Sequence, residues 1–178
     1  ITGPEDLLYT MRWEHFVELS PSLGALAGSS VIVGENKRGL GNLTTLTGGD
    51  FMLRYRPINS PERRSLTLQV EWIERQQQVA GDVLRDHGGY VDLLADLNTE
   101  WSTGYRWQLV TGIEGDLQHP DWVSERQRHS GQITWTPSHF SRIRLQGNYD
   151  ESEWLPEPVY SLMMALEVVV GAHGAHNY

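Results

Sequence analysis

The chain has 178 residues, a formal net charge of −9 at pH 7 and no cysteine. The lack of cysteine excludes disulfides, cysteine-ligated metal sites and thiol nucleophiles, and the acidic balance argues against nucleic acid as a partner. No apolar run in the sequence reaches the 18 or more positions that a membrane-spanning helix needs. Seven Trp and seven Tyr against three Phe favour aromatic residues placed at a membrane–water boundary, although an ordinary β-protein with packed aromatics is the alternative.

Apolar and polar residues alternate with a period of two along most of the chain, which predicts β-strands with one apolar face. The first such segment is 9–14, and a Gly/Ser-rich stretch over 24–33 follows it. Further alternating segments cover 51–56, 66–72, 91–101, 105–114, 132–135, 142–149 and 160–170. No segment has a convincing helical period. We therefore expect an all-β protein of about nine antiparallel strands in a single domain over residues 1–178.

Many of the apolar faces end in Trp or Tyr. These residues are Trp72, Trp101, Tyr105, Trp135, Tyr149 and Tyr160. In membrane barrels, aromatic residues collect at strand ends because those ends lie at the two interfaces of the bilayer. A soluble β-sandwich gives aromatic residues no reason to collect there. The pattern therefore favours an antiparallel transmembrane β-barrel over a soluble sandwich.

The expected connections alternate in length. Short ones lie at 20–23, 58–64, 102–104 and 137–141, and longer polar ones at 35–48, 76–88, 116–129 and 150–158. Outer-membrane barrels have short periplasmic turns and longer outer loops. With the C-terminus in the periplasm, counting strands back from the last one places every short connection on the periplasmic side.

The same count gives an odd number of strands, whereas bacterial single-chain barrels normally have an even number. We therefore expect at least one strand upstream of Ile1 and interpret the chain as the C-terminal portion of a larger barrel. The competing interpretation is an eight-stranded barrel in which the first or second strand is assigned wrongly. The Gly/Ser-rich stretch 24–30 is the least regular of the expected strands.

The end of the chain carries two motifs that resemble a known family. One is Trp135-Thr136-Pro137-Ser138-His139-Phe140-Ser141 followed by Arg144-Leu145-Gln146-Gly147-Asn148-Tyr149-Asp150, and the other is the closing Gly171-Ala172-His173-Gly174-Ala175-His176-Asn177-Tyr178. They resemble the penultimate hairpin and the terminal Gly-Ala-His-x-x-His-x-aromatic signature of large Gram-negative outer-membrane proteins. Segments 50–57 and 105–112 are similar more loosely. Members of this family are often labelled zinc-regulated, TonB-dependent-receptor-like or porin-like.

The resemblance implies a β-barrel in the bacterial outer membrane, with outer-membrane lipid and the barrel-assembly machinery as partners. It also implies an assembly signal at the end of the chain, for which the candidate residues are Tyr160, Gly171, His173, His176 and Tyr178.

His173 and His176 are also weak candidates for a metal site. A spacing of three along a strand places them on opposite faces, so they bind one metal only if the chain turns there. The neighbouring Gly171 and Gly174 permit such a turn. A zinc site would need a further ligand, for which His139 on the expected 137–141 turn is the candidate. We favour the assembly role for the histidines and expect no cofactor.

The inward-facing positions predict a ladder of cross-strand ion pairs. Its candidates are Arg54, Arg56, Arg106, Arg142, Arg144, Glu71, Asp92, Asp96, Glu114 and Glu167. In one interpretation these residues line a water-filled lumen and select solutes by charge. In the other, they only satisfy one another inside a polar barrel interior. The sequence supports these two interpretations equally.

No catalytic constellation is present in the sequence, since the loop glycines precede no helix and no nucleophile elbow occurs. We therefore expect a porin-like or transporter-like barrel that passes small solutes or ions, not an enzyme. The alternative is a plugged structural barrel that binds other envelope proteins.

Overall fold

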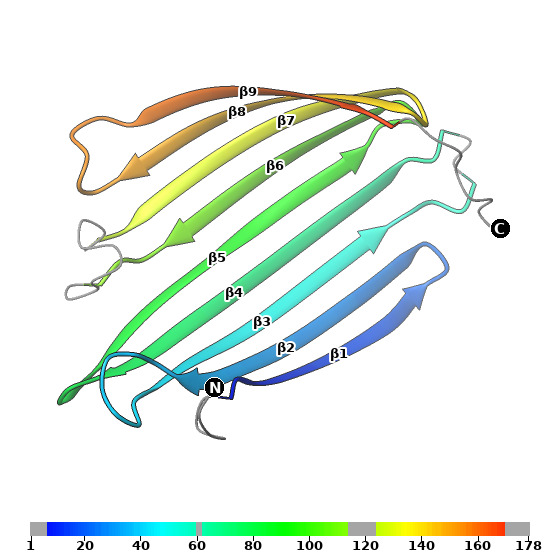
Figure 1. Ribbon diagram of the computed structural model, residues 1–178. Helices are drawn as coiled ribbons and strands as arrows, with labels where there is room; N and C mark the ends of the chain where they lie inside the picture. Colours follow the sequence, from blue (N-terminus) through cyan, green and yellow to red (C-terminus); the bar gives the residue numbers. More distant parts are fainter. Residues whose placement is uncertain (1–6, 60–61, 114–123, 170–178) are drawn as a thin grey trace.

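The computed structural model describes residues 7–59, 62–113 and 124–169. Nine strands form one antiparallel sheet, in which each strand pairs with its neighbours in sequence (Figure 1). The strands are β1 (Tyr9–Ser20), β2 (Leu23–Glu35), β3 (Leu43–Tyr55), β4 (Ser65–Val79), β5 (Asp82–Asp96), β6 (Trp101–Val110), β7 (Arg126–Ser138), β8 (Ser141–Ser152) and β9 (Val159–Val168). Across the described ranges, no helix has the length and apolar character needed to cross a bilayer.

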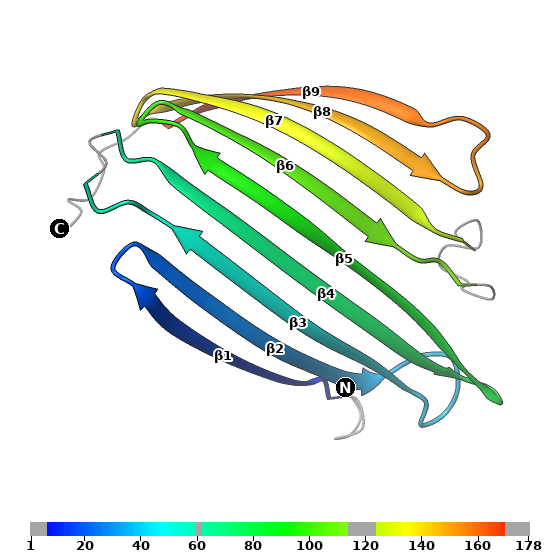
Figure 2. The same cartoon turned by 180° about the vertical axis from the view of Figure 1, so that it is seen from behind.

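The all-β antiparallel architecture expected from the alternation is confirmed. The Gly/Ser-rich stretch lies within β2, which pairs along its whole length with β3. The sheet is strongly curved but open, as the two opposite views show (Figures 1 and 2). Among the described residues, β1 pairs only with β2 and β9 only with β8, so these two strands form the free edges.

The connections lie at two ends of the sheet. At the turn end the chain passes from β1 to β2, β3 to β4, β5 to β6 and β7 to β8, and at the loop end it passes from β2 to β3, β4 to β5, β6 to β7 and β8 to β9. Several expectations about the connections are wrong. Residues 43–48 of the loop expected over 35–48 lie in β3, and residues 126–129 of the loop expected over 116–129 lie in β7. The long loop expected over 76–88 is instead a hairpin closed by Ala80 and Gly81, where Gly81 has a φ of 80° that suits glycine. The turn expected at 102–104 lies at 97–100.

Asn98 explains why this turn lies earlier in the chain than expected. Its side-chain oxygen accepts hydrogen bonds of 2.9 Å from the backbone N–H groups of Glu100 and Trp101. Such a side chain mimics a backbone turn and competes with strand pairing. Trp101 consequently begins β6 instead of ending β5.

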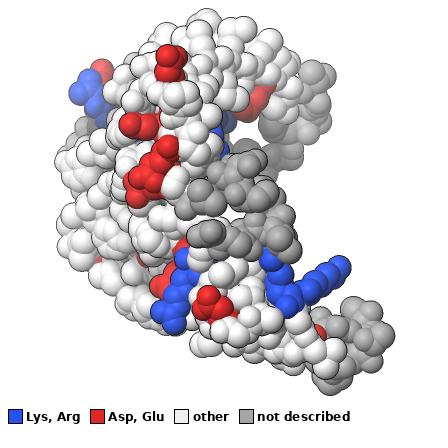
Figure 3. All heavy atoms as spheres, turned by 90° about the vertical axis from the view of Figure 1, so that its left-hand side faces the viewer, with Lys and Arg blue, Asp and Glu red and all other residues white. Residues whose placement is uncertain are grey.

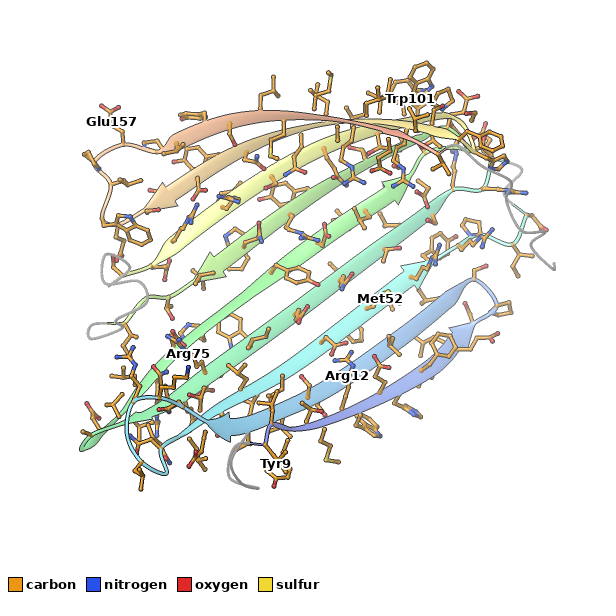
Figure 4. All side chains as sticks on the ribbon, viewed as in Figure 1. Tyr9, Arg12, Met52, Arg75, Trp101 and Glu157 are labelled. Carbon is orange, nitrogen blue, oxygen red and sulfur yellow. The ribbon has the colours of Figure 1, made fainter. Side chains whose placement is uncertain are left out.

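The concave face of the sheet is polar and the convex face is apolar. Arg12, Met52 and Arg75 lie on the concave side, whereas Tyr9 and Trp101 point away from it (Figure 4). One register row on the concave face runs from Glu14 through Gly28, Asp50, Glu71, Tyr90, Gln108 and Arg128 to Asp150. Figure 3 looks onto the loop end and shows an open C with mostly uncharged atoms on its convex side.

Burial is inverted relative to a soluble domain. Within the described ranges no hydrophobic side chain is buried, and many large ones on the convex face are exposed. The buried side chains are polar: Ser65, Asp92, Ser130, Thr134, Asn148, Asp150 and Ser152. The register places them on the concave face. What holds the sheet together is therefore strand pairing and a polar interior.

Candidate functional site

The convex surface changes character along each strand. On β4 the outward residues run from Leu66, Leu68 and Val70 to Trp72 and then become polar at Glu74. This order, from aliphatic through aromatic to charged, is the one expected where a strand passes from a hydrocarbon core through an interface into water. Strands of 10 to 15 residues are long enough for a tilted crossing, which needs about 9–11.

Aromatic and histidine rings meet in pairs on this surface, on the loop-end side. Trp72 stacks on His87 with 4.7 Å between ring centroids. Farther along the sheet, the Tyr105 hydroxyl lies 2.7 Å from Nδ1 of His129, whose ring also contacts Tyr149. Amphipathic rings of this kind suit a membrane interface because one part is apolar and the other forms hydrogen bonds.

A second aromatic pair marks the turn end. The Trp101 and Trp135 rings stack with 6.0 Å between their centroids, and Nε1 of Trp135 donates a hydrogen bond of 3.5 Å to Glu100. The convex apolar surface is therefore bordered by aromatic residues at both ends. Of the aromatic residues expected at strand ends, Trp101 begins β6, whereas Trp72 and Tyr105 lie within β4 and β6.

The concave face is divided into two walls of opposite charge. The acidic wall, on β1 to β5, carries Glu14, Glu18, Asp50, Glu71, Asp82, Asp86, Asp92 and Asp96 against Arg12, Arg54 and Arg75. The basic wall, on β6 to β9, carries Arg106, Arg126, Arg128, Arg142 and Arg144 against Asp150 and Glu167. The chain is acidic overall, yet one side of its concave face has an excess of arginine.

The two walls meet at Arg106. Its Nη2 and Nε donate to Oδ2 of Asp92 at 2.5 and 3.2 Å, so two of the ladder candidates lie side by side as an ion pair. The guanidinium also lies over the Tyr90 ring, 4.6 Å from the centroid, and Gln69 donates to the Tyr90 hydroxyl at 2.8 Å. Because Asp92 is only 7% exposed, this network fixes Arg106 in place on the wall.

Asp150 is shared by two arginines of the basic wall. Arg126 binds both of its carboxylate oxygens, and Arg128 binds Oδ2 from the facing register position. Asp150 therefore holds two guanidinium groups of the basic wall at once. Arg126 and Arg128 were missed in the sequence, where residues 116–129 were expected to form a loop.

Arg144 faces a cavity of about 270 Å³ on the basic wall. Arg106, Arg128, Gln132 and Gln146 also line it. The Nε atom of Arg144 is buried and has no hydrogen-bond partner. In the described part of the chain, Arg144 is thus the arginine on this wall without an ion pair, whereas Arg106, Arg126, Arg128 and Arg142 each have one.

Of the remaining candidates for the ladder of ion pairs, some lie next to one another and others do not. Arg142 pairs with Glu167 at 3.6 Å between exposed side chains, and Glu71 lies opposite Tyr90 in the register. Arg54, Arg56 and Asp96 line a wider cavity of about 640 Å³ at the turn end, where Asp96 accepts a hydrogen bond from Ser65 instead of pairing with an arginine. Glu114 lies outside the described residues.

Most of the expected assembly signal lies beyond the described residues, namely Gly171, His173, His176 and Tyr178. Tyr160 lies on the edge strand β9 and contacts Tyr149 with 5.3 Å between ring centroids. His139 is exposed on the β7–β8 turn beside the wider cavity. Among residues 7–59, 62–113 and 124–169, no three His, Cys, Asp or Glu side chains lie close enough together to hold a metal ion.

Comparison of the chain with protein families, with curated proteins and with solved structures finds no match.

Proposed function

We propose that this chain forms part of a bacterial outer-membrane β-barrel whose concave face lines a water-filled pathway for small solutes or ions. The inverted burial carries the proposal: polar side chains are buried on the concave face, and large hydrophobic ones are exposed on the convex face. A soluble domain buries its apolar side chains, whereas a barrel in lipid turns them outward and keeps a polar interior.

The two free edges fit a larger barrel. Strands β1 and β9 each leave one row of backbone N–H and C=O groups without a strand partner among the described residues. Such groups are costly inside a bilayer, so barrels in membranes close completely. We infer that further strands pair with both edges, and that the turn end faces the periplasm, as the resemblance to porin-like and TonB-dependent-receptor-like proteins suggests.

The divided charge of the concave face supports passage of solutes over a purely structural role. Charges that only satisfied each other would be interleaved, as the Arg75–Asp86 pair is. Instead, carboxylates dominate β1 to β5 and arginines dominate β6 to β9, so a transverse field crosses the space between the walls. Fields of this kind orient and select charged solutes in aqueous pores.

The test is conductance of the full-length protein in a planar lipid bilayer. Stable unitary current steps, in protein whose folding has been checked by its altered gel mobility without heating, are the expected result. Silence from correctly folded protein would contradict an open pathway and would favour the plugged structural barrel, whose partners among envelope proteins would then be sought by co-purification.

A further inference from the structure

We propose that Arg106, Arg128 and Arg144 form a binding site for a small oxyanion, a carboxylate or phosphate group carried by the solute. The inference adds a substrate class to the proposed pathway and rests on that pathway for access from water. The three guanidinium groups line one cavity, from the neighbouring strands β6, β7 and β8. Arginine recognises carboxylate and phosphate through a planar fork that a single halide ion cannot match.

The unsatisfied Nε of Arg144 points to an anionic ligand. The atom Nε of Arg144 is buried and has no hydrogen-bond partner, although buried donors are nearly always satisfied. The cavity lining contains one carboxylate, Asp92, which is already paired with Arg106, and the lining residues Gln132 and Gln146 are neutral. A bound oxyanion would give Arg144 the counter-charge that the described residues do not provide.

The other two arginines of the site already have partners, which hold them in position. Arg106 donates to Asp92, and Arg128 shares Asp150 with Arg126. Because each arginine has five N–H donors in a fixed fork, a pair with one carboxylate oxygen leaves donors for a ligand. The carboxylates therefore position the arginines without using up their capacity to bind an anion.

The site also lies on a continuous arginine track. In the register of β7, Arg126 and Arg128 are followed by Ser130, which pairs with Arg106, and by Thr134, which pairs with Arg144. Eight residues separate positions 126 and 134, about 27 Å at 3.4 Å per residue. An anion could thus exchange between neighbouring arginines, while the acidic wall confines it to this side.

The size of the cavity limits the ligand. A volume of about 270 Å³ equals roughly nine water molecules at about 30 Å³ each, which suits a small polyatomic anion or the charged end of a larger solute. Gly104 contributes to this space, because a Cβ there would lie 3.0 Å from Nε2 of Gln132 and closer still to Leu94.

The experiment measures equilibrium binding of inorganic phosphate to the full-length protein folded in detergent, with succinate and chloride as separate arms. The site variant is Arg144→Gln. The matched control is Arg142→Gln, on the same strand and face, whose partner is Glu167 and whose side chain does not line the cavity. Arg144→Lys retains the charge without the fork and covers the case in which the glutamine variant fails to fold.

We expect phosphate and succinate to bind the wild type saturably and chloride not to compete at equal concentration. Arg144→Gln should weaken binding about 10- to 100-fold, the range for losing a hydrogen bond to a charged group, and Arg144→Lys less, while Arg142→Gln leaves it unchanged. Absence of binding, equal loss in both glutamine variants, or full competition by chloride would overturn the oxyanion site. Binding by protein that conducts no current would overturn the proposed pathway alone, and conduction without binding would overturn the site alone.

Discussion

Arg126 on β7 and Asp150 on β8 are joined by two parallel hydrogen bonds, from Nε to Oδ1 at 2.7 Å and from Nη2 to Oδ2 at 2.6 Å. Two-fold contacts of this kind fix both the distance and the orientation of the guanidinium plane. Asp150 is only 10% exposed and also accepts hydrogen bonds from Arg128. The loop-end part of the basic wall is therefore organised around Asp150.

Replacing Asp150 by Asn is expected to destabilise the folded protein by about 1.5–3 kcal/mol, because two arginines lose their charged acceptor. Unfolding by urea in lipid vesicles, followed by tryptophan fluorescence, measures the change. The control is Glu167→Gln, which removes an exposed pair with Arg142 and should cost at most about 1 kcal/mol. Equal effects of the two substitutions would show that Asp150 does not organise the wall.

Gly89 allows Trp72 to lie flat against the neighbouring strand. A Cβ at position 89 would lie 2.5 Å from the carbonyl oxygen of Glu71 and 2.6 Å from Cε3 of Trp72. We expect Gly89→Ala to cost about 1–3 kcal/mol in the same unfolding measurement and to alter the Trp72 emission. At Gly131 an added Cβ meets nothing within 4 Å, so Gly131→Ala is the control and should be close to neutral. A neutral Gly89→Ala would contradict the close contact.

The sequence predicted the strands best where the residues on the convex face are apolar. The period-two pattern of 66–72 and 142–149 depends on outward aliphatic and aromatic side chains, and both segments lie within strands, β4 and β8. The period-two pattern disappears where the outward residues are polar. On β7 the outward positions begin with Gln127, His129 and Gly131, so the first part of that strand resembled a loop, and Arg126 and Arg128 were missed.

The same limit explains the β4–β5 hairpin. Beyond Trp72 the outward residues of β4 are Glu74 and Gln76, so no apolar face marks the strand although its pairing with β5 continues to Val79. The inward charges were predictable as a class from the alternation. Which of them pair with each other was not predictable, because the partners depend on strand register. The register places Arg106 opposite Asp92, but it places Ser65 opposite Asp96.

Adjacent substitutions on β4 test which face meets lipid. Leu68 points outward and Thr67 inward, where it lies opposite Arg54 in the register. A lysine on a lipid-facing side near mid-membrane costs about 2–4 kcal/mol, so Leu68→Lys should reduce the yield of folded protein in vesicles. Thr67→Lys should reduce it less, since a like charge opposite Arg54 costs at most about 1 kcal/mol. The yield is read from the folded band in unheated gels. A larger loss for Thr67→Lys would mean that the two faces are assigned the wrong way round.

The basic wall predicts the ion preference of the pathway. Replacing Arg142 and Arg144 together by Glu changes the local charge by four units on β8, opposite the carboxylates of the acidic wall, so the current should shift strongly toward cations. The measurement is the reversal potential across a planar bilayer under a salt gradient. Because the double variant also disturbs the contact with Glu167, the control is Glu167→Gln, which removes that contact and should move the preference slightly toward anions. Unchanged selectivity of the double variant, in protein that still forms stable channels, would show that these arginines do not line the conducting path.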